Sequence, residues 1–129
     1  MKPQSVKQRL GYQANQLWIL ACIKAHGQVC EICGKPGQQV HHFYPKGNYG
    51  HLRYNIDNGI ILCKGCHFQL HHTNNTLNLD IVKKRGQEWI DALEKKAKDR
   101  PKGSYCTVKW YNNEIERLKE AINQVNKKL

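Results

Sequence analysis

The sequence predicts a small α+β domain, in which a β-hairpin and one helix form a metal-braced ββα centre flanked by an N-terminal helix and by C-terminal helices. Two short segments with strand composition, residues 38–44 (QQVHHFY) and 59–63 (GIILC), are separated by a polar loop rich in glycine and asparagine. Cys-x-x-Cys pairs flank these segments, and helical periodicity precedes and follows them. At 129 residues the chain has the length of one domain.

The composition indicates a polyanionic partner. Lysine and arginine number 21 against 10 aspartate and glutamate, which gives a net charge of +11. Such an excess favours nucleic acid as the partner over the alternative that the charge only keeps the protein soluble. No apolar run approaches the ~20 residues that cross a bilayer, and the first residues lack the apolar core of a signal peptide. We therefore expect a cytoplasmic protein without a membrane partner.

The N-terminal part divides into an arm and a helix. Residues 1–11 are predicted to form a basic arm that contains Pro3. Residues 12–27 predict a helix, because apolar residues recur at i, i+3 and i+4 and Gly27 is a typical helix stop. Cys22 lies within this helix, where we expect it to serve as a small buried apolar residue.

The C-terminal part is predicted to be helical. Residues 28–75 would form the metal-braced centre, and residues 76–105 a helical extension that ends in a basic link at 95–104 (KKAKDRPKGS). The periodicity of the extension fits either two short helices or one helix that is interrupted near Gly86.

A last amphipathic helix is predicted over residues 106–129. Its apolar residues follow the heptad spacing of a coiled-coil seam. They are Val108, Tyr111, Ile115, Leu118, Ile122, Val125 and Leu129. Glu114 and Lys119 are spaced for pairing between two such helices. The pattern leaves two uses of the seam open, a homodimer through this helix or packing against the rest of the chain.

Four cysteines predict a structural zinc site. Cys30 and Cys33 form one C-x-x-C pair, and Cys63 and Cys66 form another after 29 intervening residues. Each pair can present two thiolates to one ion, and four soft ligands in tetrahedral geometry favour Zn²⁺. Because a short hairpin and one helix bury little apolar area, the ion would supply folding energy. Cys106 stands apart and is expected to be an incidental thiol.

Histidines between and after the cysteine pairs predict a second, catalytic metal. His41 and His42 are adjacent in a predicted strand, so they point to opposite faces: one can coordinate an ion while the other accepts a proton. His67 and His71 are four residues apart on a predicted helix and can bind one ion together. His72 is one position off and should point away. Imidazole ligands suit Mn²⁺, Ni²⁺, Co²⁺ or Zn²⁺ better than Mg²⁺, although Mg²⁺ as the cellular ion stays open.

The pattern HH…DN…CHxxxH, from Cys30 to His72, resembles the HNH, or ββα-metal, endonucleases in their zinc-knuckle form. The resemblance implies a metal-dependent hydrolase of DNA phosphodiester bonds. Read onto this sequence, it makes His42 the general base and His41, His67 and His71 the metal ligands. It places Asn58 in the catalytic set with His42, as the residue that braces the hairpin.

Two basic residues of the hairpin loop, Lys46 and Arg53, are candidates for DNA binding at the scissile phosphate. The alternative for both is a solvated loop charge. By the same resemblance, cleavage would leave 5′-phosphate and 3′-hydroxyl ends.

Segments along nearly the whole chain look like phage recombination endonucleases of the Rap/NinG type. They include HLRYNIDN, LCKGCHFQLH, KKRGQEWIDALEKKA and KWYNNEIERLKEAIN. This second resemblance implies a phage-type enzyme of DNA recombination or processing, acting on DNA that includes branched intermediates in the host-cell cytoplasm. Two alternatives remain, a non-catalytic zinc-stabilised DNA-binding module and a homing or packaging nickase with the same chemistry.

Overall fold

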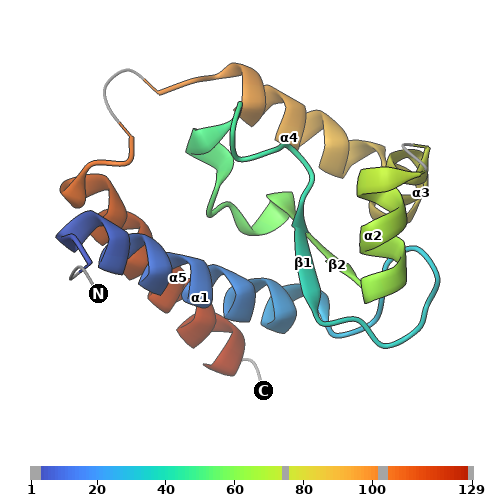
Figure 1. The fold of residues 1–129 in the computed structure, drawn as a ribbon, viewed down its shortest axis with the longest axis horizontal. Coiled ribbons are helices and arrows are strands. Elements are labelled where there is room, and N and C mark those ends of the chain that lie inside the picture. Colours follow the sequence, from blue (N-terminus) through green and yellow to red (C-terminus); the bar gives the residue numbers. More distant parts are fainter. Residues whose placement is uncertain (1–3, 74–75, 102–104, 128–129) are drawn as a thin grey trace.

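The computed structural model describes residues 4–73, 76–101 and 105–127 and confirms the predicted α+β fold (Figure 1). The helices and strands follow one another as α1 (Val6–His26), β1 (Gln39–His42), β2 (Gly59–Leu62), α2 (Lys64–His72), α3 (Leu77–Arg85), α4 (Gln87–Lys98) and α5 (Val108–Lys127), with short 3₁₀ turns at Gly50–Leu52 and Ile56–Asn58. Among the described helices none combines the length and apolarity needed to span a membrane.

The antiparallel hairpin of β1 and β2 lies between two groups of helices (Figure 1). All four residues of β2 are buried, which explains its continuous apolar run. Ile61 packs into a core with α1 and α5, whereas Ile60 and Leu62 pack into a second core with α2 and α3. His41 is paired with Ile60 and His42 with Gly59. The two histidines therefore face the two different cores.

Helix α1 begins at Val6, so the prediction of a basic arm over residues 1–11 is wrong for its second half. Ser5 and Gln8 form a capping box: the Ser5 hydroxyl accepts from the Gln8 amide at 3.1 Å, and Gln8 Oε1 accepts from the Ser5 amide at 2.9 Å. These bonds satisfy two amide groups that a helix start otherwise leaves without partners, and so they start the helix early. Lys2 and Pro3 lie outside the described residues.

The apolar seam of α5 packs against α1 within the chain. Tyr111, Ile115, Leu118 and Ile122 are buried in one core with Trp18 and other residues of α1. Within α5, Glu114 pairs with Arg117 and Lys119 pairs with Glu116. The seam is thus occupied inside one molecule, and of the two uses left open by the sequence the structure shows packing against the chain. Leu129, at the end of the predicted seam, lies outside the described residues.

The helical extension is two helices that meet at Gly86. This residue has φ +100°, a backbone conformation that favours glycine, and its amide closes α3 on the Val82 carbonyl at 2.7 Å. Helix α4 then continues to Lys98, so the first four residues of the predicted link at 95–104 are helical. Residues 102–104 of that link lie outside the described part of the chain.

A buried ion pair between Glu31 and Arg85 connects the first cysteine pair to the hairpin and to α3. The two side chains are 8% and 11% exposed. Glu31 also accepts from the Ile61 amide at 2.7 Å, and Arg85 also donates to the Gly59 carbonyl at 2.6 Å. The charges are thus paired and hydrogen-bonded on several sides, which is what makes their burial tolerable.

Gly59 allows α1 to approach the hairpin closely. A Cβ atom at this position would lie 2.4 Å from Cys22 Sγ and 3.0 Å from the indole of Trp18. Cys22 is fully buried, as the sequence predicts, and burial raises the pKa of its thiol to about 12. Close contact between α1 and β2 therefore requires glycine here.

We expect Gly59→Ala to lower the free energy of unfolding by about 1–3 kcal/mol, because the added methyl group overpacks the contact with α1. Gly47→Ala is the matched control, since nothing lies within 4 Å of its Cβ position. Urea denaturation with zinc present measures both. Equal stability of the two variants would contradict the close approach.

Candidate functional site

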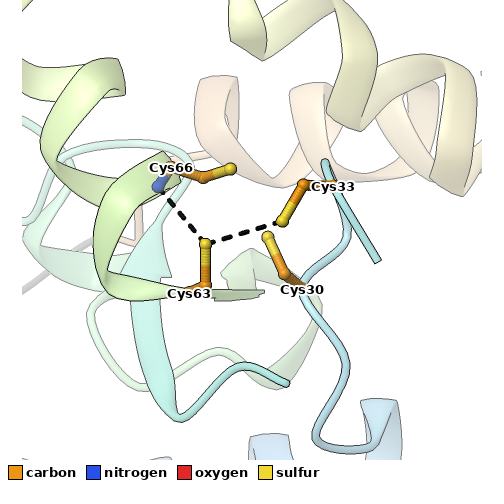
Figure 2. Close-up of side chains that lie close together, drawn as sticks. All are labelled: Cys30, Cys33, Cys63 and Cys66. Carbon is orange, nitrogen blue, oxygen red and sulfur yellow. Dashed lines mark hydrogen bonds between the residues drawn. The ribbon is translucent and has the colours of Figure 1, made fainter. Parts of the chain in front are cut away.

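The four predicted cysteines come together at one end of the ββα unit (Figure 2). Cys30 and Cys33 lie in the turn after α1, and Cys63 and Cys66 at the start of α2. All four sulfur atoms lie within 4.8 Å of one another, and Cys33 Sγ is 3.6 Å from Cys63 Sγ. Tetrahedral Zn²⁺ with bonds of about 2.3 Å places its sulfur ligands about 3.8 Å apart. The donors and their spacing fit a structural zinc ion.

The electrostatics of this cluster also fit a cation. Although burial opposes ionisation of Cys30, hydrogen bonds from the backbone around Cys33, Cys63 and Ile32 lower the pKa of its thiol to about 6. Burial and the neighbouring thiols raise the pKa of Cys66. Crowded thiols thus ionise unequally without a positive charge among them, and a bound cation is what would hold all four as thiolates.

Three of the predicted histidines form a second cluster. His41 of β1 and His67 and His71 of α2 each offer a ring nitrogen, and these atoms lie within 4.8 Å of one another. His67 Nε2 is 3.1 Å from His71 Nε2. Ligands on one ion with bonds of about 2.0–2.1 Å lie about 2.9–3.4 Å apart, so this pair is set for a shared metal. His41 is 8% exposed, and burial lowers its pKa to about 3, which keeps the ring neutral for coordination.

Gln39 orients His67, a contact that the sequence reading missed. The Nδ1 atom of His67 is hydrogen-bonded to Gln39 Oε1. An amide oxygen only accepts, so Nδ1 carries the proton and Nε2 presents its lone pair toward His71. The signal was present in the sequence, because Gln39 precedes His41 by two residues in a strand and shares its face. Such a partner fixes the tautomer of a metal ligand.

His42 lies on the other face of β1, away from the histidine cluster. Its Nε2 is 3.0 Å from the Arg53 carbonyl oxygen. Because a carbonyl only accepts, Nε2 carries the proton and Nδ1 keeps its lone pair. The ring is stacked on the indole of Trp18 with centroids 4.2 Å apart and planes 15° apart. Burial, helped by the charges of Lys46 and Arg53, lowers the pKa of His42 to about 4, so the ring is neutral at pH 7.

Asn58 is fully buried and holds the loop between the strands. Its Oδ1 accepts from the Tyr44 amide at 2.8 Å, and its Nδ2 donates to the carbonyls of Tyr44 at 3.1 Å and Leu52 at 3.3 Å. The side chain therefore joins the end of β1 to the turn at Gly50–Leu52. These contacts are those of a brace for the hairpin loop.

One cavity of about 440 Å³ reaches both histidine groups. Helix α1 forms one wall through Asn15, Trp18 and Ile19, and α2 forms the other through His67 and His71. His41, His42 and Lys46 also line it. Arg53 does not line the cavity: its guanidinium lies 5.6 Å from the ring of Tyr54, and its buried Nε has no hydrogen-bond partner among the described residues. His72 is exposed, its ring is tilted against that of Phe68, and it is not one of the three clustered histidines.

Removing one thiolate should release the structural ion. We expect Cys33→Ser to lose most of its tightly bound zinc and to lower the melting temperature by at least about 5 °C, because the ion contributes folding energy. Metal content by mass spectrometry and thermal denaturation measure both effects. His71→Ala is the control and should keep this zinc. A Cys33→Ser protein with full zinc content would show that the cluster is not the site.

Removing the Gln39 amide should weaken the second site. We expect Gln39→Ala to bind Co²⁺ at the histidine cluster about 10–100-fold more weakly, because His67 loses the partner that fixes its tautomer. The absorbance of Co²⁺ added to zinc-loaded protein measures this affinity. Gln38→Ala is the matched control, because this neighbouring glutamine is also exposed and the hydrogen bond to His67 comes from Gln39. Equal affinities for the two variants would exclude the proposed role of Gln39.

Comparison with known proteins points to the segment that contains the two clusters. Residues 30–73 match the family model described as HNH endonuclease. No curated protein and no solved structure matches the chain. The matched segment begins at the first cysteine pair and ends just after α2, so it holds both clusters and the whole hairpin. It does not reach α3–α5, and the likeness to the Rap/NinG type stays a prediction. Residues 30–73 of the chain are thus similar to the HNH endonuclease family.

Proposed function

We propose that this protein is a metal-dependent DNA endonuclease that hydrolyses phosphodiester bonds with one divalent ion. The proposal rests mainly on one cavity that two groups of histidines line. One is His42, a neutral imidazole with a free ring nitrogen, and the other is the cluster of three histidines that could hold a metal ion. A binding module has no need for a proton acceptor beside a metal cluster. The net charge of +11 suits a polyanionic substrate.

The proposed role of His42 is general base. Nδ1 takes a proton from water, and the resulting hydroxide attacks phosphorus in line with the leaving 3′-oxygen. The Arg53 carbonyl holds the Nε2 proton and so keeps Nδ1 as the acceptor. A phosphodiester anion in the cavity would favour the protonated ring and raise the pKa of His42 from its low value.

His41, His67 and His71 would hold the divalent ion, which supplies Lewis-acid stabilisation of charge on the phosphoryl and leaving oxygens. Three neutral nitrogen donors favour Mn²⁺, Ni²⁺, Co²⁺ or Zn²⁺ over Mg²⁺ in affinity. The ion used in the cell also depends on its supply, and Mg²⁺ belongs among the metals to be tested.

Two cations are proposed to contact the DNA. Lys46 lines the cavity and is exposed, so its ammonium group can reach a phosphate there. Arg53 acts from beside the cavity: its charge lowers the pKa of His42, and its Nε has no partner among the described groups. A phosphate that approaches His42 would meet both charges.

For the substrate, we propose DNA of recombination or processing intermediates, including branched DNA, in a phage-type enzyme. The support is the likeness of segments outside the catalytic unit to recombination endonucleases. A nickase with the same chemistry would differ in its products. Nicked circles, linear DNA and resolved junctions separate these possibilities on a gel.

We expect His42→Ala to reduce cleavage of plasmid and four-way-junction DNA by about 10²–10⁴-fold while DNA affinity is kept, because only the proton acceptor is removed. Cleavage is measured with each divalent metal in turn and binding by gel shift at fixed salt. His72→Ala, which removes an exposed imidazole outside the cluster, is the control.

Two results would count against this assignment. If His42→Ala cuts as fast as the wild type, the base is another group. If the wild type binds DNA and cuts neither substrate with any metal, the protein is a non-catalytic zinc-stabilised DNA-binding module.

A further inference from the structure

We propose that Trp18 of α1 is a positioning residue for the catalytic histidine, and that α1 is thereby part of the catalytic apparatus although it lies outside the HNH segment. The inference rests on the proposed function of His42 as general base. Trp18 itself is 1% exposed, so it acts through His42 and not on the DNA.

Two parallel rings are fixed to one short stretch of loop. The indole of Trp18 and the imidazole of His42 stack at 4.2 Å and 15°. Trp18 Nε1 donates to the Asn55 carbonyl at 2.8 Å, and His42 Nε2 donates to the Arg53 carbonyl at 3.0 Å. The carbonyls are two residues apart. Each ring is thus held at its edge by the loop and on its face by the other ring.

The hairpin leaves space for the indole of Trp18 directly beside His42. Gly59 is the residue paired with His42 across the two strands. A Cβ there would come within 3.0 Å of the Trp18 indole, so any other residue would push the two elements apart. Tyr111, Ile115 and Leu118 of α5 pack in the same core as Trp18. Trp18 therefore has little freedom to leave the imidazole.

The stack removes the rotation that His42 would otherwise retain. An imidazole that is held by only one hydrogen bond can rotate about its Cβ–Cγ bond, and this rotation changes the direction in which Nδ1 points. The flat indole at 15° blocks that turn, and the Nε2 bond to the Arg53 carbonyl then fixes which nitrogen is left free as the acceptor. Misplacement of a catalytic group by about 1 Å can cost about 10²-fold in rate. The effect falls on the chemical step and not on DNA binding.

The test is a cycle of single and double variants with the full, zinc-loaded chain. We expect Trp18→Leu to lower kcat about 10–100-fold and to change KM less than about threefold, because DNA contacts remain. Trp18→Phe keeps a flat ring and should recover most of kcat. Trp18→Leu added to His42→Ala should cause no further loss, since the group on which it acts is gone.

A signal that does not depend on cleavage accompanies the kinetics. The ring protons of His42 should be shifted upfield by the stacked indole in NMR spectra of the wild type, and this shift should disappear in Trp18→Leu. Trp110→Leu is the matched control, because Trp110 packs against the same core without a ring contact to His42. It should leave both the His42 shift and kcat unchanged.

Several outcomes would overturn the proposal. The first is that Trp18→Leu lowers kcat by the same factor in the wild type and in the His42→Ala variant. The second is that Trp18→Leu raises KM at constant kcat. The third is that the NMR chemical shifts of the His42 ring protons are the same in the wild type and in Trp18→Leu. If His42→Ala alone keeps full activity, the general-base assignment fails instead. In that case the NMR shift still decides whether Trp18 holds the ring.

Discussion

The alternation of side chains along β1 is the constraint on which the arrangement depends. Adjacent residues in a strand point to opposite faces, so His41 and His42 cannot serve the same ion. His41 faces the core of α2 and α3, and His42 faces α1. Each imidazole therefore needs its own support from a different part of the chain. The two proposed functions can meet because one cavity is lined by both histidines.

The hairpin that carries these residues is too small to be stable alone, and three kinds of interaction hold it. Helices cover both of its faces, so that all of β2 is buried. The four-cysteine cluster joins the turn before β1 to the start of α2. The Glu31–Arg85 pair adds a polar connection from the first cysteine pair to the β2 backbone and α3. Because the last two both begin at residues 30–33, loss of either would loosen the same end of the unit.

Features with a local signature were predictable from the sequence. The strands follow from composition, the pair His67 and His71 from helical spacing, and the cysteines from ligand spacing. Contacts between distant segments were not predictable in the same way. Nothing near Glu31 indicates Arg85, 54 residues away, and no pattern in α1 indicates that Trp18 meets His42. The seam of α5 shows the general limit, since an amphipathic pattern states that a face is buried but not against which partner.

The proposed metal ligands and the proposed base differ in which part of the sequence supplies their supporting residues. All ligands of both proposed metals, and Gln39 as well, lie in residues 30–73, so the metal side is contained in the HNH segment. The side of the proposed base depends on α1, which lies before that segment, and on α5, which covers α1 from the other end of the chain. A segment of this length can thus carry the full HNH pattern while His42 lacks its second contact surface. In the proposed arrangement the added helices complete the orientation of the base, and Gly59, at the contact between the two parts, leaves no space for a side chain.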